Sequence, residues 1–426
     1  MRTRMWMGTI VAILCCGCAA TSSMPRSHLQ LNVKNVGAVG DGKTVDTAAF
    51  QKALDQCGAA GGGEIVVPVG DYLIGSLVMP SHITLRLEKG ATLIGSADPL
   101  DYPLVDVRWE GRWRQGHRAL IHAKNAEQIA IVGAGTINGD MNVGDLREPR
   151  GPCIFEPIEC KDVRIEGIHV NYRRMWAIHL TYCQNVLAKD LTIRSTRANG
   201  DGIDVDSSRE VRIDDCDIDT GDDAIALKSG RGMEGVRIGR PTENVTISNC
   251  RLGSAFAGVA LGTEMSGGIR HIRIDHCTFT RGSNSIFVKS RSDRGGFMED
   301  IEGHDLTVAG AKCFLRFDLL ERGLKDSEPV PGLEGIARVG NIRMSNVKVD
   351  TDFLIDARAT SPDKPVQGLS VANVTGTCRR GIVLNNVKDV DLRDIQVSGF
   401  SGPLVTATNV TGKGTENAQL PRKTSG

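Results

Sequence analysis

A pattern of four apolar or small positions, spaced Φ-x-Φ-x-x-Φ-x-Φ, recurs through most of the chain. Alternation with a period of two is typical of β-strands, and the two-residue break inside the pattern predicts a tight corner. Successive strong copies start 21 to 41 residues apart, at Val163, Val186, Val211, Val245, Ile272, Ile301, Ile342, Leu369 and Val390, with a weaker copy at Ile129. One such unit is too short to bury its own apolar face, whereas stacked units share a continuous core. The pattern therefore predicts an all-β solenoid with loops of different lengths projecting from its coils.

The corner of each repeat has a recurring chemistry. The residue before the third apolar position is usually one that accepts turn geometry, namely Asp190, Asp215, Asn249, His276, Asp305, Asn346, Asn373 and Asp394. We interpret these residues as structural corners. Cys216, Cys250 and Cys277 follow three of them at one position of the repeat. We therefore expect a column of buried thiols there rather than disulfide partners.

A short helix is predicted before the repeats. Asp46 is a suitable N-cap for residues 47–54, where Phe50, Ala53 and Leu54 share one helical face. We expect this helix to cap the open end of the solenoid, where unpaired strand edges would favour aggregation.

The two ends of the chain differ from the repeats. Residues 1–18 resemble an export leader, with Arg2 and Arg4 before a short apolar stretch. Gly17-Cys18 resembles a lipoprotein cleavage site, which would anchor the protein to a membrane through Cys18; ordinary cleavage near Ala19-Ala20 is the alternative. We therefore predict an exported protein, either a periplasmic or outer-surface lipoprotein or a secreted one.

The same pattern divides the chain into four parts. They are the leader at 1–18, a linker at 19–33, the solenoid domain at 34–410 and a mobile tail at 411–426. The 51 basic residues equal the 51 acidic ones, which argues against nucleic acid as a partner. Aromatic residues make up only 4% of the chain, so we expect a core of aliphatic side chains. We predict a monomer with no cofactor and no metal.

Candidate chemistry appears where the strands after the corners are aligned. Asp201 and Asp223 then occupy equivalent places on adjacent coils, with Asp222 beside them. Neighbouring strands lie about 4.8 Å apart, so these carboxylates should be close neighbours. Like charges at short range raise at least one pKa, which yields a protonated acid beside an ionised base. Glycoside hydrolysis needs such a pair; a turn or a calcium site at Asp222-Asp223 is the alternative.

Two motifs extend this picture by resemblance. Residues 199–204 read NGDGID and residues 220–230 read TGDDAIALKSG, which closely resembles glycoside hydrolase family 28, the polygalacturonase family. Segments at 36–42, 108–111, 135–139 and 262–268 also agree, so the resemblance covers nearly the whole chain beyond the leader.

The resemblance implies a right-handed parallel β-helix and an inverting mechanism. Asp222 matches the family's general acid, while Asp201 and Asp223 match the pair that holds and activates the hydrolytic water. Inversion requires about 6.5–9.5 Å between the acid and base carboxyl groups. Lys289 matches a lysine that grips the galacturonate carboxylate. The implied partner is an acidic plant-type polysaccharide or oligosaccharide.

Two positions depart from the family pattern. Phe256 stands where the family has a histidine, and Phe287 stands where it has an arginine. Phenylalanine offers only apolar contact or stacking, whereas arginine can clasp a carboxylate with two hydrogen bonds. Because all three aspartates are present, we expect retained hydrolysis with a preference moved from plain homogalacturonan towards a mixed or branched pectic substrate or another uronic-acid polymer.

Further candidates for substrate contact have ordinary alternatives. Trp109 would stack on a sugar or pack under a loop. Glu264 lies in a family-like segment, Lys228 would bind substrate or tune the carboxylates, and Arg294 would neutralise an acidic sugar or lie in a solvated basic loop. The 34-residue step between the repeats at Val211 and Val245 implies a loop near the site, which favours attack at a chain end.

Two other functions remain open from the sequence. One is a calcium-dependent polysaccharide lyase on the same fold. The other is a β-helix that binds carbohydrate without cleaving it. The presence of all three aspartates favours hydrolysis over both.

Overall fold

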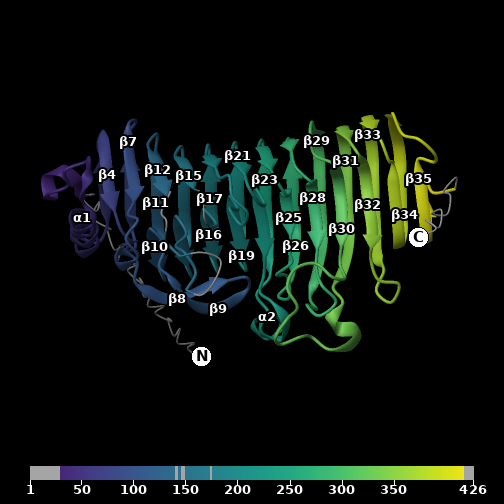
Figure 1. Ribbon diagram of the computed structural model, residues 1–426, viewed down its shortest axis with the longest axis horizontal. Coiled ribbons are helices and arrows are strands. Elements are labelled where there is room, and N and C mark those ends of the chain that lie inside the picture. Colours follow the sequence, from purple (N-terminus) through teal and green to yellow (C-terminus); the bar gives the residue numbers. More distant parts are fainter. Residues whose placement is uncertain (1–28, 140–142, 145–148, 173–174, 417–426) are drawn as a thin grey trace, which may run out of the picture.

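The computed structural model describes residues 29–139, 143–144, 149–172 and 175–416. The chain winds as an elongated parallel β-helix, with the first strands at the purple end of Figure 1 and the last at the yellow end. Three columns of parallel strands run along its length. One strand of each column comes from each coil, so most strands pair with the strand three places further along the chain.

The first column contains the repeat pattern. Its strands are β1 (Leu29–Asn32), β3 (Gly63–Val67), β6 (Ile83–Leu87), β11 (Glu127–Gly133), β14 (Lys161–Glu166), β17 (Gln184–Lys189), β20 (Arg209–Asp214), β23 (Thr242–Ser248) and β26 (Ile269–Asp275). The second column follows each corner. Its strands are β2 (Asp41–Val45), β4 (Gly70–Ile74), β7 (Ala91–Gly95), β12 (Thr136–Gly139), β15 (His169–Tyr172), β18 (Thr192–Arg194), β21 (Asp217–Thr220), β24 (Arg251–Ser254) and β27 (Thr278–Arg281).

Towards the C-terminus these two columns join into long strands. They are β29 (Phe297–Val308), β31 (Arg338–Thr351) and β33 (Val366–Cys378), while β34 (Ile382–Ser398) and β35 (Val405–Lys413) also begin with residues that continue the third column. The third column holds the candidate site. Its strands are β5 (Leu77–Val78), β10 (Ile121–Lys124), β13 (Phe155–Ile158), β16 (Ile178–Thr181), β19 (Ile203–Asp206), β22 (Ile225–Lys228), β25 (Ala257–Leu261), β28 (Asn284–Lys289), β30 (Cys313–Asp318) and β32 (Phe353–Ala359).

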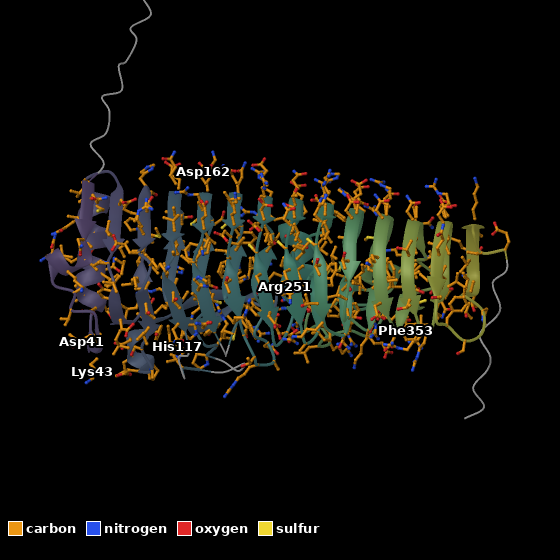
Figure 2. All side chains as sticks on the ribbon, turned by 90° about the horizontal axis from the view of Figure 1, so that it is seen from above. Asp41, Lys43, His117, Asp162, Arg251 and Phe353 are labelled. Carbon is orange, nitrogen blue, oxygen red and sulfur yellow. The ribbon has the colours of Figure 1, made fainter. Side chains whose placement is uncertain are left out.

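The register of the first column confirms the repeat predicted from the sequence. The residues that begin the copies are direct partners from Ile129 and Val163 through to Leu369 and Val390. Their side chains are buried in one continuous core. Figure 2 shows side chains filling the interior along the whole length, while polar ones such as Asp162 point outwards.

The predicted corners and thiols are also confirmed. All eight corner residues have φ between 51° and 57°, the left-handed conformation that Asn and Asp tolerate better than most residues. The nine cysteines in the described part of the chain are buried and free, including the column at Cys216, Cys250 and Cys277.

The helix before the repeats is α1 (Thr47–Ala59), which buries Phe50, Ala53 and Leu54. Asp46 stands at its N-cap position, but its side chain makes no capping hydrogen bond to the helix. Its carboxylate instead accepts hydrogen bonds from Val39 N at 2.7 Å and Gly40 N at 3.0 Å. The expectation of Asp46 as a side-chain cap was therefore wrong, because the preceding turn takes up both oxygens. That α1 shields the end of the sheet stays a prediction.

The solenoid is longer than predicted at both ends. β1 pairs in register with β3, so regular structure already begins at Leu29 within the expected linker, and β35 extends to Lys413. The leader and Cys18 lie outside the described residues, as do residues 417–426 of the expected tail. Neither α1 nor the shorter α2 (Gly232–Ile238) is long and apolar enough to cross a membrane.

Three segments project from one side of the coils, on the lower side of Figure 1. They are the antiparallel hairpin of β8 (Leu104–Trp109) and β9 (Arg112–His117), the segment containing α2, and the 319–337 loop, which includes the 3-10 helix η3 (Gly332–Gly335).

Candidate active site

The third column brings Asp201 and Asp223 to adjacent coils, as the sequence predicted. Asp201 lies two residues before Ile203 and Asp223 two residues before Ile225, and these isoleucines are direct partners in β19 and β22. A backbone hydrogen bond agrees with this register: Gly202 N donates to the carbonyl oxygen of Asp223 at 3.0 Å. The two residues therefore occupy equivalent places on adjacent coils of the third column.

The three aspartates differ in exposure. Asp201 is 3% exposed and Asp223 is 1% exposed, whereas Asp222 is partly exposed. The Asp222 carboxylate is held in place by two backbone donors, Asn199 N on Oδ2 and Asp223 N on Oδ1, each at 3.0 Å. The more accessible carboxylate is thus fixed in orientation beside two buried ones.

The environment raises the proton affinity of the buried pair. Burial raises the pKa of Asp201 well above its usual range, and the charges of Asp204, Asp222 and Asp223 raise it further against the opposing charge of Lys228. Burial also raises the pKa of Asp223, and Asp222 adds to this while Lys289 opposes it. The site therefore combines several carboxyl groups with separately tuned proton affinities.

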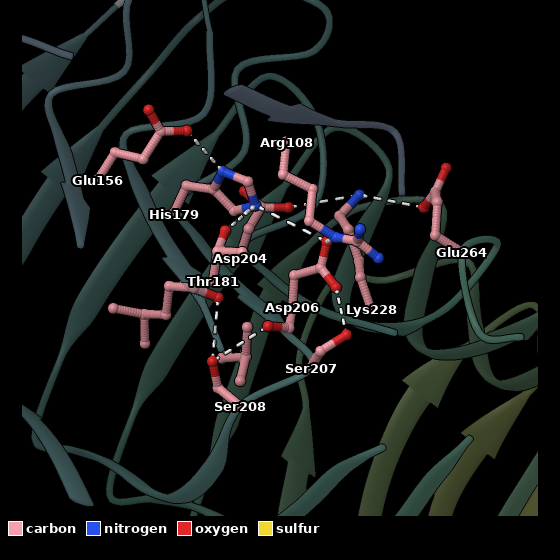
Figure 3. Close-up of polar contacts among 12 residues, drawn as sticks. Arg108, Glu156, His179, Thr181, Asp204, Asp206, Ser207, Ser208, Lys228 and Glu264 are labelled. Carbon is pink, nitrogen blue, oxygen red and sulfur yellow. Dashed lines mark hydrogen bonds and ion pairs between the residues drawn. The ribbon is translucent and has the colours of Figure 1, made fainter. Parts of the chain in front are cut away.

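Lys228 is the central cation of this cluster. Its Nζ lies 3.3 Å from Asp204 Oδ1, 3.5 Å from Glu264 Oε2 and 3.7 Å from Asp201 Oδ2. It also lies 4.3 Å from the centre of the Trp176 ring. Burial alone would lower the pKa of Lys228, but Glu264 and the aspartates raise it well above its usual value. Lys228 therefore stays charged and neutralises the carboxylates around it (Figure 3).

Glu264 and Arg294 extend the cluster away from solvent. Burial would raise the pKa of Glu264, but Lys228, Arg294 and Lys289 lower it to about 2, so the carboxylate is ionised. Arg294 is fully buried, and its Nη1 lies 2.5 Å from Asp326 Oδ2. The alternative of a solvated basic loop is therefore wrong for Arg294, because its guanidinium is occupied inside the protein.

Sequence reasoning missed a buried polar row beside the aspartates. His179 pairs in register with Asp204, and its Nδ1 lies 3.0 Å from Glu156 Oε1. Arg150 Nη2 donates to the same Glu156 oxygen at 2.6 Å. Figure 3 shows this row running from Glu156 through His179 towards Asp204 and Lys228. The aligned strand segments already paired His179 with Asp204, but only the fold shows that both side chains are buried.

Trp109 lies in the wall of the site. Its ring packs on Trp176 with centroids 4.7 Å apart, and it is almost fully buried. Its neighbour Arg108 donates from Nε to Asp206 Oδ2 at 2.8 Å. Packing, the ordinary alternative for Trp109, describes its position, because its ring is packed on Trp176, two residues before β16 (Ile178–Thr181).

On the side of the site opposite Trp109 are Lys289 and the two phenylalanines that depart from the family pattern. Lys289 Nζ lies 2.6 Å from Asp223 Oδ2 and 4.8 Å from the centre of the Phe256 ring. The rings of Phe256 and Phe287 are 5.5 Å apart. An aromatic pair therefore adjoins the catalytic candidates where the family resemblance implied histidine and arginine.

The three projecting segments are tied together by one carboxylate. Asp326 of the 319–337 loop pairs with Arg112 of the hairpin, with Arg231 just before α2 at 3.2 Å, and with Arg294. The side chain of Asp326 has no exposed surface. These contacts join hairpin, helix and loop into one wall beside the third column.

Two groups of described residues have the composition of a metal site. They are Cys153, Glu156 and His179, which are buried, and His276, His304 and Asp305, which lie nearer the surface. Arg150 already binds the first group, with Nη1 2.8 Å from Cys153 Sγ. Neither group contains Asp201, Asp222 or Asp223.

Comparison with known proteins agrees with this arrangement. The family model described as "Glycosyl hydrolases family 28" matches residues 57–313. A "Probable polygalacturonase" of Vitis vinifera is 34% identical over 374 residues, which is 82% of this chain and 74% of that protein. An "Exo-poly-alpha-D-galacturonosidase" of Dickeya chrysanthemi is 26% identical over 330 residues, which is 65% of this chain and 54% of that protein.

The fold is also that of a solved structure. A hyperthermoactive exopolygalacturonase from Thermotoga maritima superimposes with a TM-score of 0.74 at 24% identity, covering 91% of this chain and 92% of that one. At this identity the likeness concerns the fold.

Proposed function

The chain belongs to glycosyl hydrolases family 28, and from this premise we propose that it hydrolyses a pectic or other uronic-acid polysaccharide with inversion, using Asp222, Asp201 and Asp223. The class of enzyme, a glycoside hydrolase, follows from the family. The mechanism and the substrate are the proposal.

One observation carries the mechanism: the Asp222 carboxylate, partly exposed and fixed by two backbone N–H donors, stands beside the buried carboxyl groups of Asp201 and Asp223. In the proposed step the Asp222 proton passes to the leaving glycosidic oxygen as the bond to the anomeric carbon breaks. A water held by Asp201 and Asp223 attacks that carbon from the opposite face and gives its proton to this pair. The product sugar then has the inverted anomeric configuration.

The local charge supports an acidic substrate. Lys289 lies between Asp223 and the aromatic pair, where it can meet a sugar carboxylate beside the reacting bond. The named activities of the relatives, polygalacturonase and exo-polygalacturonosidase, also concern galacturonate polymers. Phe256 and Phe287 favour a mixed or branched pectic polymer over plain homogalacturonan, because apolar rings cannot hydrogen-bond to a carboxylate.

The wall beside the site supports attack at a chain end. Trp109 packed on Trp176 and Arg108 bound to Asp206 place the hairpin directly against the strands that carry the aspartates. A site that the hairpin blocks on one side would accept the terminus of a polymer more readily than its middle.

The first test removes the proposed acid. We expect Asp222→Asn to lower kcat on defined pectic oligosaccharides by about 10²–10⁴-fold, because proton donation to the leaving oxygen is lost. NMR of the first product formed by the wild type should show the inverted anomer. Asp190→Asn, an exposed corner aspartate, is the matched control and should keep full activity.

Three results would contradict parts of the proposal. Equal sugar release by Asp222→Asn and the wild type would exclude Asp222 as the acid. An unsaturated, ultraviolet-absorbing product would indicate elimination instead of hydrolysis. Equal rates on unbranched oligogalacturonide and mixed pectin would remove the shifted preference while leaving the hydrolytic mechanism intact.

A further inference from the structure

Three cations surround the Phe256–Phe287 pair. Arg322 of the 319–337 loop lies with its Cζ 4.8 Å from the centre of the Phe256 ring and 5.6 Å from that of Phe287. Arg316 lies 5.4 Å from the Phe287 ring, and Lys289 lies near both rings. Of the three, Lys289 is already paired with Asp223.

The two arginines differ from the other arginines near the site. Within the described part of the chain, the guanidinium groups of Arg316 and Arg322 form no hydrogen bond and no ion pair, whereas those of Arg108, Arg231 and Arg294 are bound to carboxylates. Both free arginines are partly exposed. A guanidinium carries five donors, so each retains its full capacity to bind an anion.

Among the residues that the structure describes, the acidic ones next to these two arginines do not form ion pairs or hydrogen bonds with their guanidinium groups. Asp356 is the strand partner of Arg316, but both of its oxygens accept hydrogen bonds from Arg358, at 2.8 and 2.7 Å. Asp318 is the strand partner of Lys289, and burial raises its pKa although Arg322 and Arg316 act to lower it. The charge of the two arginines is therefore only partly balanced by the protein.

The fold places Arg316 on the coil that follows Phe287, with Arg322 in the loop after it. Phe287 and Arg316 are direct partners on adjacent coils, which are about 4.8 Å apart. The backbone N of Arg322 donates to Ser290 O at 3.1 Å, which fixes the start of the loop beside Lys289. A guanidinium stacked on an aromatic ring keeps its N–H edges free for hydrogen bonds in its own plane. The two rings thus orient the arginines without consuming their donors.

We propose that Arg316 and Arg322 form a carboxylate-binding subsite for an acidic sugar, one coil beyond Phe287. This inference rests on the proposed function, since it assigns the sugar residue next to the reacting bond to a uronic acid. It assigns Phe256 and Phe287 the role of positioning residues for the two guanidinium groups. The selectivity of the site for acidic sugars then comes from the adjacent coil and loop.

The test measures binding separately from hydrolysis. In an Asp222→Asn background, the dissociation constants of trigalacturonate and of its fully methyl-esterified form are measured by calorimetry. We expect the acid to bind more tightly than the ester. Adding Arg322→Gln should weaken binding of the acid about tenfold or more, and leave binding of the ester within about twofold, because only the acid offers a charged acceptor. Arg316→Gln should act in the same direction.

Arg380→Gln is the matched control. Arg380 stacks on Phe353 at 5.2 Å, so it has the same cation–aromatic contact away from the aspartates, and its removal should leave both constants unchanged. Arg322→Lys keeps the positive charge but loses the planar pair of N–H donors, so it should weaken binding of the acid less than Arg322→Gln does. This variant also shows whether the effect of Arg322→Gln comes from a folding defect.

The outcomes separate the subsite from the proposed function. Equal weakening of acid and ester by Arg322→Gln, or no weakening of either, would overturn the subsite. Selective weakening of the acid in a protein whose wild type releases no sugar would support the subsite and overturn hydrolysis. Equal binding of acid and ester before any arginine is changed would also overturn the subsite.

Discussion

Asp223 sits between opposing influences on its proton. Burial and the neighbouring Asp222 favour the protonated carboxyl, whereas the Lys289 ammonium, 2.6 Å away, favours the ionised one. Lys289 therefore has two consequences at the scale of single residues: it helps to position Asp223, and it keeps the pKa of that carboxyl lower than burial alone would allow.

Removal of Lys289 should move the acidic limb of the activity profile. In Lys289→Met the pKa of Asp223 rises further because its cationic neighbour is gone. Activity that needs ionised Asp223 should then begin at a higher pH. The limb is measured as kcat against pH at saturating substrate, so that loss of substrate binding does not enter. Lys161→Met, an exposed lysine on β14, should leave the limb in place; a shift of the Lys289→Met limb to lower pH would contradict this account.

At the scale of single elements, the coil depends on its corners. The eight predicted corner residues adopt left-handed φ values, where a Cβ-bearing residue without a short polar side chain is strained. The same polar residues also form ladders along the solenoid; Asn346, for example, donates to Asp305 at 3.1 Å and accepts from Asn373 at 3.1 Å. Corner chemistry thus both permits the turn and links neighbouring coils.

Asp190 gives a clean measure of the corner strain. It is exposed at φ 52° and its side chain makes no hydrogen bond within the described residues. We expect Asp190→Ala to lower the free energy of unfolding by about 1–2 kcal/mol through backbone strain, and Asp190→Gly to lower it less, since glycine adopts this φ freely. Urea unfolding monitored by circular dichroism compares the two variants. Greater loss in the glycine variant would show that backbone strain is not the main cause of the destabilisation.

At the scale of the whole molecule, Asp326 joins segments that are far apart in the sequence. Arg112, Arg231 and Arg294 come from three different segments of the chain and converge on this one buried carboxylate. Removing one partner from a buried charge network leaves the others uncompensated. The wall proposed to favour attack at a chain end is therefore held together in large part by the Asp326 carboxylate.

Asp326→Asn should loosen that wall. We expect a stability loss of about 3–5 kcal/mol, faster proteolysis within residues 319–337, and a higher share of internal cleavage on a long substrate. Thermal unfolding, mass spectrometry of the protease fragments and product sizing measure these effects. Asp352→Asn is the control, because its pair with Arg379 is a surface one that should contribute at most about 1 kcal/mol. An unchanged product pattern in a folded Asp326→Asn protein would separate the wall from the mode of attack.

The sequence alone determined the coil register, the corners, the buried thiols and the adjacency of Asp201 and Asp223. These features depend on contacts between successive coils, so the spacing of apolar and turn residues is sufficient to specify them. Only the tertiary structure decided that Trp109 and Arg294 are buried, that Glu156 and His179 join the row beside the aspartates, and that Arg322 reaches Phe256. Those contacts are made by loops and by residues far apart in the chain, whose paths no repeat pattern encodes.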